Sequence, residues 1–307
     1  MNRVLSCTLA LFLSLNGSAR AQTRDKLSHY LYEDTKQLVA LVEDAASLIE
    51  QKGEAALLQF GVKNSKWLND QRYLFVYDLN GKCVFHPVEP QLLGQDLIGL
   101  EDLDGRPMIT MITDVGKKPE ADASGWIFYL WEESPQSRVP AWKSSYVRKA
   151  VAPSGTVYLV GSGLYNMKME RSFLEERVDQ AADLIADKGK QIALGELRNR
   201  ASPLHIQNTY ITVTDRQGDI VVDPSFPNLL KKRSLIAFRD KTGRNIYAQI
   251  TKGLEKKDRM WLLYIWPKGD ASRLARHMMY VRKVKADGEV FYVSANFVPA
   301  TPVWMKQ

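Results

Sequence analysis

Two long segments of the sequence place apolar residues at the spacing of an amphipathic helix. Residues three and four apart lie on the same face of a helix, so each segment is predicted to bury one apolar stripe. Each segment closes in a Lys-Gly pair, at 52–53 and 188–189. Such a pair suits a helix C-terminus, because the cation lies near the negative end of the helix dipole and glycine adopts left-handed conformations. The stripes are Leu38, Leu41, Val42, Ala45, Leu48 and Ile49, and Phe173, Leu174, Val178, Ala181, Leu184 and Ile185.

Two shorter segments carry the pattern of a β-hairpin. YLFVYDLNGKCVFHP, residues 73–87, sets strand-forming residues on both sides of Asn80-Gly81, a dipeptide typical of a tight turn. YITVTDRQGDIVVDP, residues 210–224, repeats this pattern, and a hairpin is predicted in each. The recurring pairs are Tyr73 and Tyr210, Asp78 and Asp215, Gly81 and Gly218, and Pro87 and Pro224.

The repeat continues after the hairpins. Trp126-Ile-Phe-Tyr-Leu-Trp131 corresponds to Trp261-Leu-Leu-Tyr-Ile-Trp266, and Tyr146-Val-Arg-Lys149 corresponds to Tyr280-Val-Arg-Lys283. A last strand is predicted in each copy, at 157–163 and at 290–296. Because the unit is far longer than a solenoid repeat, the sequence predicts whole duplicated domains. The predicted fold class is α+β, with two tandem modules that each pack a long N-terminal helix on an antiparallel sheet of roughly five strands.

A long stretch separates the second and third predicted strands of each copy. These stretches, 89–124 and 225–258, contain proline, glycine and charged residues. Loops of that length inside a compact domain are often lids or binding loops. We therefore expect each to close the sheet face that the helix leaves open, with a hollow beneath it.

The first 21 residues have the features of a secretory signal peptide. Arg3 precedes an apolar run at 4–15 that is too short to span a bilayer, and Ala19-Arg20-Ala21 fits a cleavage site. A lipoprotein signal at Cys7 is the alternative, although the apolar run follows that cysteine instead of preceding it. The predicted domains are the signal peptide at 1–21, a first module at 22–166 and a second module at 167–307.

Composition and charge narrow the function classes. The net charge of +7 is small, and its lysines and arginines are scattered among acids, which favours a solvated surface over nucleic-acid binding. No later segment is long and apolar enough for membrane insertion. Cys83 alone remains after processing, so no intrachain disulfide is expected. Catalytic motifs are absent and the histidines lack metal-ligand spacing, so we expect no enzyme, cofactor or metal. The histidines are His29, His86, His205 and His277.

The order of fragments in the first copy resembles the single Cache domain of the second type. The fragments are a helix ending in Lys-Gly, Ala-Ala-Leu-Leu-Gln-Phe, Phe-Val-Tyr-Asp-Leu-Asn-Gly, His-Pro, Leu-Leu-Gly-Gln-Asp-Leu, Asp-Leu-Asp-Gly-Arg-Pro, Gly-Trp-Ile-Phe-Tyr-Leu-Trp, Lys-Ser-Ser-Tyr-Val-Arg-Lys and Val-Gly-Ser-Gly-Leu-Tyr. The resemblance covers 38–165 and implies a PAS-like extracytoplasmic sensor module, as found in chemoreceptors and sensor kinases. The second copy, 173–297, looks like a divergent Cache module, with Asp223 for His86, His277 for Lys143 and Ala295-Asn296 for Ser162-Gly163.

The resemblance also implies a ligand site in the first copy. Its aromatic and cationic side chains would suit a small anion. Side chains two apart in a strand share a face, which groups Tyr129 with Trp131 and Tyr146 with Arg148. The same residues would equally suit a core packed against the helix. The implied site residues are Tyr129, Trp131, Lys143, Tyr146, Arg148, His86 and Asp104, with Asp102 and Gly105 in the same loop as Asp104.

The sequence therefore predicts a periplasmic ligand-binding sensor protein of a kind used in chemotaxis and signal transduction. Its first module would bind a small molecule, a short carboxylate or amino acid, and relay binding to a membrane-bound sensor or chemoreceptor. The second module would serve as a scaffold, weaker site or docking surface. The prediction requires Tyr129, Tyr146 and Lys143 to converge on one enclosed void. The alternative is a periplasmic protein-interaction module that needs no ligand.

Overall fold

The computed structural model describes residues 25–70, 72–134, 137–225, 234–268 and 273–300. The predicted signal peptide lies outside these residues. The chain forms two compact units, one of residues up to 100 with 109–127 and 144–165, the other of 101–108, 128–143 and 166 onward. The module boundary placed between residues 166 and 167 stays a prediction.

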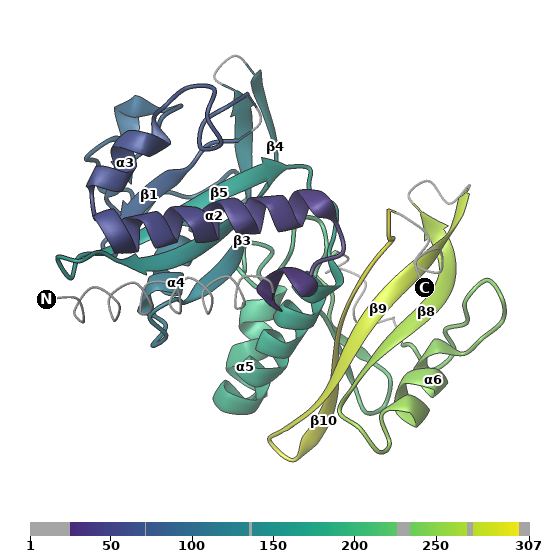
Figure 1. Cartoon of the computed structure of the whole chain (residues 1–307). Helices are drawn as coiled ribbons and strands as arrows, with labels where there is room; N and C mark the ends of the chain where they lie inside the picture. Colours follow the sequence, from purple (N-terminus) through teal and green to yellow (C-terminus); the bar gives the residue numbers. More distant parts are fainter. Residues whose placement is uncertain (1–24, 71, 135–136, 226–233, 269–272, 301–307) are drawn as a thin grey trace, which may run out of the picture. The chain divides into compact units, whose positions relative to one another are not determined.

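Both predicted long helices are present (Figure 1). Helix α2 spans Glu33–Lys52 and ends as predicted at Gly53, whose φ is 60° and whose N–H donates to Ile49 O at 2.7 Å. Helix α5 spans Arg171–Arg198. Gly189, with φ 75°, interrupts α5 where its end was predicted, and the helix then resumes. Both glycines therefore have a positive φ, while the chain that follows them differs. A short helix, α3, follows α2 at Ala55–Phe60.

The first sheet has five strands in the order β2-β1-β5-β4-β3. Its hairpin is held by Asp78, whose Oδ1 accepts from the N–H groups of Asn80 and Lys82, and by Gly81 at φ 85°. The predicted turn is therefore confirmed. The strands are β1 (Phe75–Asp78), β2 (Cys83–Phe85), β3 (Ser124–Ser134), β4 (Ser137–Val151) and β5 (Val157–Tyr165).

The second sheet repeats this order as β7-β6-β10-β9-β8. Its hairpin also repeats the first, because Asp215 Oδ1 accepts from the N–H groups of Gln217 and Asp219, and Gly218 has φ 88°. The strands are β6 (Thr212–Asp215), β7 (Ile220–Val222), β8 (Arg259–Lys268), β9 (Arg273–Ala286) and β10 (Glu289–Phe297). The α+β class with two five-stranded sheets is therefore as predicted.

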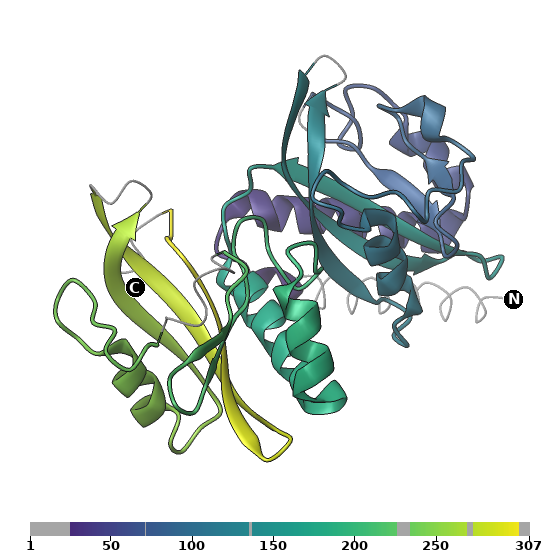
Figure 2. The same cartoon turned by 180° about the vertical axis from the view of Figure 1, so that it is seen from behind.

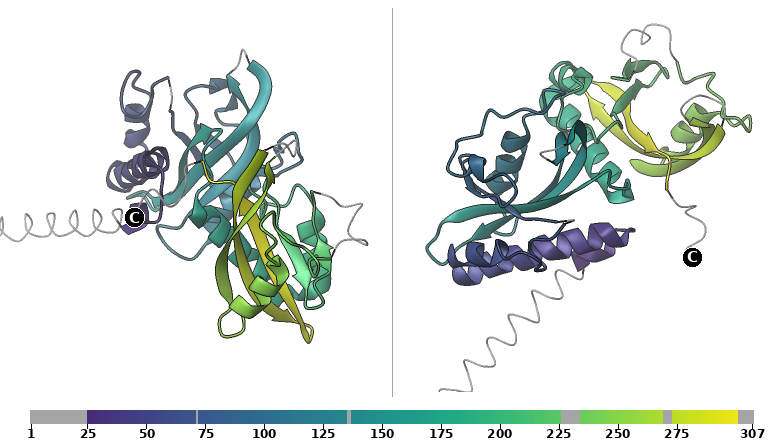
Figure 3. Two further views of the ribbon diagram at one scale, coloured as in Figure 1. Left: turned by 90° about the vertical axis from the view of Figure 1, so that its right-hand side faces the viewer. Right: turned by 90° about the horizontal axis from the view of Figure 1, so that it is seen from above.

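Each sheet lies between a long helix and a short one. In the first sheet α2 runs along one face (Figure 3, right), and α4, Met108–Lys117, lies on the other, where Gly116 sits against Leu159 of β5. In the second sheet α5 contacts β9 and β10. Helix α6, Ile246–Gly253, packs an apolar cluster on the opposite face (Figure 2).

The two long stretches are not loops throughout, and this corrects the sequence prediction. The stretch 89–124 contains the 3-10 helix η1, Pro90–Leu92, and α4, while 225–258 contains α6. The apolar residues of α4 are buried at helical spacing, a signal that the charged and glycine-rich flanks obscured. A helix therefore helps to close the second face of each sheet. The buried residues of α4 are Met108, Ile109, Met111, Ile112 and Val115.

Side-chain size is matched across β1 and β5. Phe75 lies opposite Gly161, and a Cβ on Gly161 would come within 2.5 Å of the Phe75 ring. The corresponding pair in the second sheet is Thr212 and Ser294, two side chains of moderate size. Glycine is therefore required at 161 by space, since its neighbour fills the volume that a side chain would need.

We expect Gly161→Ala to lower the free energy of unfolding by about 1–3 kcal/mol, because the added methyl group overpacks a buried ring. Gly99→Ala is the control, since a Cβ there meets nothing within 4 Å and its expected effect is below about 0.5 kcal/mol. Urea denaturation of both variants measures the difference. Equal stabilities would show that Phe75 moves aside without cost.

Candidate functional site

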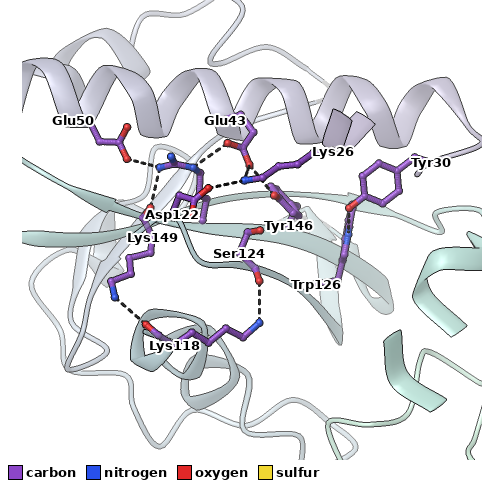
Figure 4. Close-up of polar contacts among 11 residues, drawn as sticks. Lys26, Tyr30, Glu43, Glu50, Lys118, Asp122, Ser124, Trp126, Tyr146 and Lys149 are labelled. Atoms are coloured by element: carbon purple, nitrogen blue, oxygen red, sulfur yellow. Dashed lines mark hydrogen bonds and ion pairs between the residues drawn. The ribbon is translucent and has the colours of Figure 1, made fainter. Parts of the chain in front are cut away.

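A buried carboxylate on α2 organises the polar contacts of the first unit (Figure 4). Glu43 is 6% exposed, and its Oε1 accepts from the Tyr146 hydroxyl at 2.8 Å and from Lys26 Nζ at 3.1 Å. Arg148 Nε lies 2.9 Å from Glu43 Oε2, an ion pair without the geometry of a hydrogen bond. Two cations and one hydroxyl therefore compensate the cost of burying this charge.

The protonation of the two β4 side chains suits this arrangement. Burial, followed by the charge of Glu43, raises the pKa of Tyr146 far above its usual value, so the phenol stays a donor. Burial alone would lower the pKa of Arg148, but Glu50 and Glu43 outweigh it, and the pKa is raised. Arg148 Nη1 also donates to Glu50 Oε1 at 2.6 Å. Two side chains of β4 thus hold two acids of α2.

The lysine of the same Tyr-Val-Arg-Lys motif binds on the other side of β4. Lys149 Nζ donates at 3.0 Å to the carbonyl of Lys118, immediately after α4. Lys118 Nζ in turn donates to Ser124 O at 3.0 Å. Because neighbouring strand residues point to opposite faces, this one motif attaches β4 to α2 on one face and to the end of α4 on the other.

The second unit repeats these attachments with different residues. Asp179 of α5 lies 3.4 Å from the Tyr280 hydroxyl and 3.6 Å from Arg282 Nη1. Lys283 Nζ donates to the carbonyl of Leu254, immediately after α6. The ring contact of Trp126 with Tyr146 also recurs, with centroids 5.3 Å apart there and 5.2 Å apart in the second unit. The motif that the sequence singled out therefore joins sheet to helices in both units.

Two predicted site residues, Tyr146 and Arg148, consequently point toward α2. Lys143 lies three residues before Tyr146, so regular alternation places it on the opposite face of β4. The predicted convergence of Lys143, Tyr129 and Tyr146 on one void is therefore not what the structure shows, because the Tyr146 hydroxyl is bonded to the helix. A ligand-binding role for these residues stays a prediction.

The other strand residues of the predicted site, Tyr129, Trp131 and Lys143, are on the face of their strands opposite to the one that carries Phe128 and Tyr146. Phe128 packs on Phe173 of α5, with ring centroids 5.3 Å apart, so alternation turns Tyr129 and Trp131 to the opposite face of β3. Their rings meet edge to face at 6.4 Å. Lys143 is fully buried. At the matching positions of the second sheet, Tyr264 and His277 are direct cross-strand partners with stacked rings 5.1 Å apart.

The last two predicted residues, His86 and Asp104, have local structural contacts. His86 is buried; its Nδ1 accepts from the N–H of Glu89 at 2.9 Å, and its ring meets that of Tyr73 edge to face. Asp104 is exposed, and its backbone N–H donates to Asp102 Oδ1 at 2.9 Å. His86 belongs to the first unit and Asp104 to the second.

The sequence analysis missed the importance of Arg106, which lies two residues after Asp104. This arginine is fully buried and donates to the carbonyls of Phe128, His205 and Gln207, each at 3.2 Å. Burial lowers its pKa, and Asp102 opposes that effect. Asp102 Oδ2 also accepts from the N–H of Leu130 at 2.8 Å. The signal was present, because Asp-x-x-Gly-Arg recurs at 240–244.

His205 is buried beside Arg106 and is neutral. Its Nδ1 accepts from the N–H of Ile211 at 3.1 Å, while Nε2 lies 3.1 Å from Leu197 O and 3.0 Å from Asn199 O, so Nε2 carries the proton. Burial, followed by the charge of Arg106, lowers the pKa of His205 to about 4. Protonation of this ring therefore opposes folding.

In the described part of the chain, no cluster of histidine, cysteine and acidic side chains could hold a metal ion. Cys83 is buried, and burial raises the pKa of its thiol to about 11, which disfavours the reactive thiolate. Among the same residues, no helix has both the length and the apolarity to cross a bilayer.

Comparison with known proteins identifies a family and several relatives that are similar to this chain. A family model described as a Cache domain matches residues 20–288. Cache domains are extracytoplasmic sensor modules, a non-enzymatic kind of domain. The methyl-accepting chemotaxis protein McpP of Pseudomonas putida is 28% identical over 138 residues, which are 45% of this chain. That match covers only 24% of the length of the chemotaxis protein.

Solved structures of sensor domains are also similar. A Cache chemosensory domain studied for carboxylic acid recognition is 24% identical, with a TM-score of 0.36, over 44% of this chain and 94% of that domain. The ligand-binding domain of the Pseudomonas fluorescens chemoreceptor CtaA, in complex with L-alanine, is 13% identical, with a TM-score of 0.31, over 96% of this chain and 99% of that one.

We expect Glu43→Ala to cost about 3 kcal/mol of unfolding free energy, because it leaves a buried arginine and phenol without their carboxylate. The neighbouring Asp44→Ala is a matched control. Asp44 forms an ion pair with Lys66 in which both side chains are more than half exposed, so its loss should cost less than about 1 kcal/mol. Urea denaturation distinguishes the two, and similar losses would contradict a dominant role for Glu43.

We also expect a pH-dependent contribution from His205. Its pKa in the folded protein, about 4, lies below the unfolded value of 6.5, so its contribution is complete above pH about 6.5 and declines as the pH falls toward 4. The stability difference between wild type and His205→Gln should therefore shrink by about 2 kcal/mol from pH 7.5 to 5.0. Denaturation curves of both proteins at the two pH values measure it. Parallel stability profiles would show that His205 titrates normally.

Proposed function

The chain belongs to the Cache domain family, and from this premise we propose that it is a periplasmic sensor protein that binds a small carboxylate or amino acid. The family match confirms the resemblance inferred from the sequence. Membership supports binding over catalysis, because Cache domains are sensors. The similarity to a methyl-accepting chemotaxis protein supports a role in chemosensing.

We further propose two tandem Cache modules, at 22–166 and 167–307, following a signal peptide at 1–21. The equal strand order of the two sheets supports a duplication. So does the repeated attachment of each sheet to its long helix, through Tyr146 with Glu43 and through Tyr280 with Asp179. The first module is the proposed sensor, and the second serves as scaffold or docking surface.

The observation that carries the ligand proposal is the complete burial of Lys143. Lysine is almost never fully buried, and strongly desolvated ionisable groups gather at functional sites. An ammonium group in such surroundings binds a carboxylate strongly, because little water competes with the charge-assisted hydrogen bond. Lys143 is therefore proposed to bind the ligand carboxylate. Tyr129 and Trp131, which share one face of β3, are proposed as aromatic walls.

Strand β4 offers a route from the ligand to the helix. Lys143 and Tyr146 lie three residues apart on this strand, and Tyr146 and Arg148 are bonded to Glu43 of α2. A ligand that draws in Lys143 would move the strand that holds α2. In this proposal Tyr146 and Arg148 transmit binding without touching the ligand, and a membrane-bound sensor or chemoreceptor receives the change.

We expect at least one compound from a panel of short carboxylates and amino acids to stabilise the protein in a thermal-shift screen. Isothermal titration should then show that Lys143→Met weakens binding at least about tenfold, the loss expected for one charge-assisted hydrogen bond. The methionine keeps the length of the side chain and removes its charge.

Lys117→Met is the matched control, because that lysine is 63% exposed and pairs with the exposed Asp114. Its affinity should equal that of the wild type. Tyr129→Ala, which removes the proposed aromatic wall, is a second variant if Lys143→Met folds poorly, and it should also weaken binding. Absence of any stabilising compound, or full affinity in both site variants, would refute the proposal.

A further inference from the structure

The chain that follows the first sheet packs back onto one of its strands. After β5 ends at Tyr165, the N–H of Asn166 donates to Trp142 O on β4 at 2.8 Å. Phe173, at the start of α5, then packs on Phe128 of β3, with ring centroids 5.3 Å apart. Phe128 is fully buried in this arrangement.

The corresponding part of the second sheet is exposed. Leu263 of β8 stands where the first copy has Phe128, because each is the third residue of the repeated Trp-x-x-Tyr-x-Trp segment. The Leu263 side chain is 43% exposed, and Ile265 on the same face is half-buried. Leu274 of β9 is 61% exposed and pairs with Pro267 on this face. An apolar strip of the second sheet therefore faces solvent.

The described residues leave a half-open hollow of about 400 Å³ at this strip. Almost all of its accessible surface is apolar, so its arginines contribute mainly their aliphatic stems. The Arg244 guanidinium is already paired, since Nη2 lies 2.7 Å from Asp240 Oδ2 and donates to Leu263 O at 2.9 Å. We call this site the Leu263 hollow, and it suits an apolar side chain. Its lining residues are Thr242, Arg244, Leu263, Tyr264, Ile265 and Arg276.

The chain leaves the second sheet close to the Leu263 hollow. Phe297, the last residue of β10, pairs with Met278 of β9, and Met278 pairs with Leu263 of β8. Neighbouring strands lie about 4.8 Å apart, so the end of β10 is roughly 10 Å from Leu263. About six extended residues span about 20 Å, so the chain from residue 303 onward is long enough to enter the hollow.

The sequence beyond the described residues carries apolar side chains at this distance along the chain. Residues 301–307 read Thr-Pro-Val-Trp-Met-Lys-Gln, with three consecutive apolar residues at 303–305. Met305 is as far past the last residue of β10 as Phe173 is past the last residue of β5. The 303–305 segment therefore corresponds in position to the start of α5, which covers Phe128 in the first copy.

We propose that the 303–305 segment docks in the Leu263 hollow, with the Trp304 ring on Leu263 and Ile265. Burial of apolar surface drives this contact, because an aromatic ring removes a large apolar area from water. Each sheet is then covered by the chain that follows it. The contact involves neither Lys143 nor a ligand, so it stands independently of the function proposed above.

Proteolysis of the full chain tests the docked contact. Chymotrypsin cleaves after tryptophan, and docking protects the bond between Trp304 and Met305. Leu263→Asp places a charge in the hollow, so cleavage at this bond should become at least about tenfold faster. Ile236→Asp is the matched control and should leave the rate unchanged. Ile236 is also apolar and exposed, but it lies beside Gly218, in the hairpin at the opposite edge of the sheet.

Disulfide trapping locates the segment directly. Arg276→Cys, at the exposed rim of the hollow, is combined with Lys306→Cys, and peptide mass spectrometry should find a 276–306 disulfide within one chain. It should form at least about tenfold faster than the disulfide of Ile236→Cys with Lys306→Cys, and Trp304→Ala should abolish that preference. Equal rates for the two pairs, a disulfide that forms only between two chains, or cleavage unchanged by Leu263→Asp would overturn the inference.

Discussion

The attachment of sheet to helix depends on one buried negative charge. Glu43 is a buried carboxylate on an otherwise apolar helix face, and its burial is costly unless cations and a hydroxyl contact it. Tyr146, Arg148 and Lys26 make these contacts. The alternation of β4 then has a second effect, because the lysine that follows Arg148 faces the other way and binds the end of α4. Because β4 supplies the partners of this carboxylate, its register is fixed relative to α2 on one face and α4 on the other.

Asp179 occupies the corresponding place in the second unit with longer contacts. Its distances to Tyr280 and Arg282 exceed those of Glu43 to Tyr146 and Arg148. A shorter side chain on α5 leaves more distance to the strand, and Arg259 of β8 adds a third partner at 3.2 Å. The same types of contact therefore recur in both copies, with longer distances in the second.

The sequence was informative where a local pattern decides the structure. The apolar stripe ending at Gly53 and the turn at Gly81 appear as expected, since helical period and positive φ are local properties. The side of the sheet to which Tyr146 points could not be predicted from the local sequence, because it depends on Glu43 on a helix about a hundred residues away. Helix α4 was missed because glycine and charge flank its short apolar pattern. The importance of Arg106 could be inferred only from the recurrence of Asp-x-x-Gly-Arg at 240–244, because its sequence neighbours do not indicate that it is buried.

The large Phe75 side chain lies opposite the small Gly161, and this affects which strands pair while a chain with two similar sheets folds. Repeated domains tend to exchange equivalent strands while they fold. A first hairpin that joined β10 in place of β5 would set its phenyl ring against Ser294, where the native neighbour is Thr212. The bulky ring would have no recess there, and the recess at Gly161 would stand empty. The unequal pair therefore disfavours pairing of the first hairpin with the second sheet.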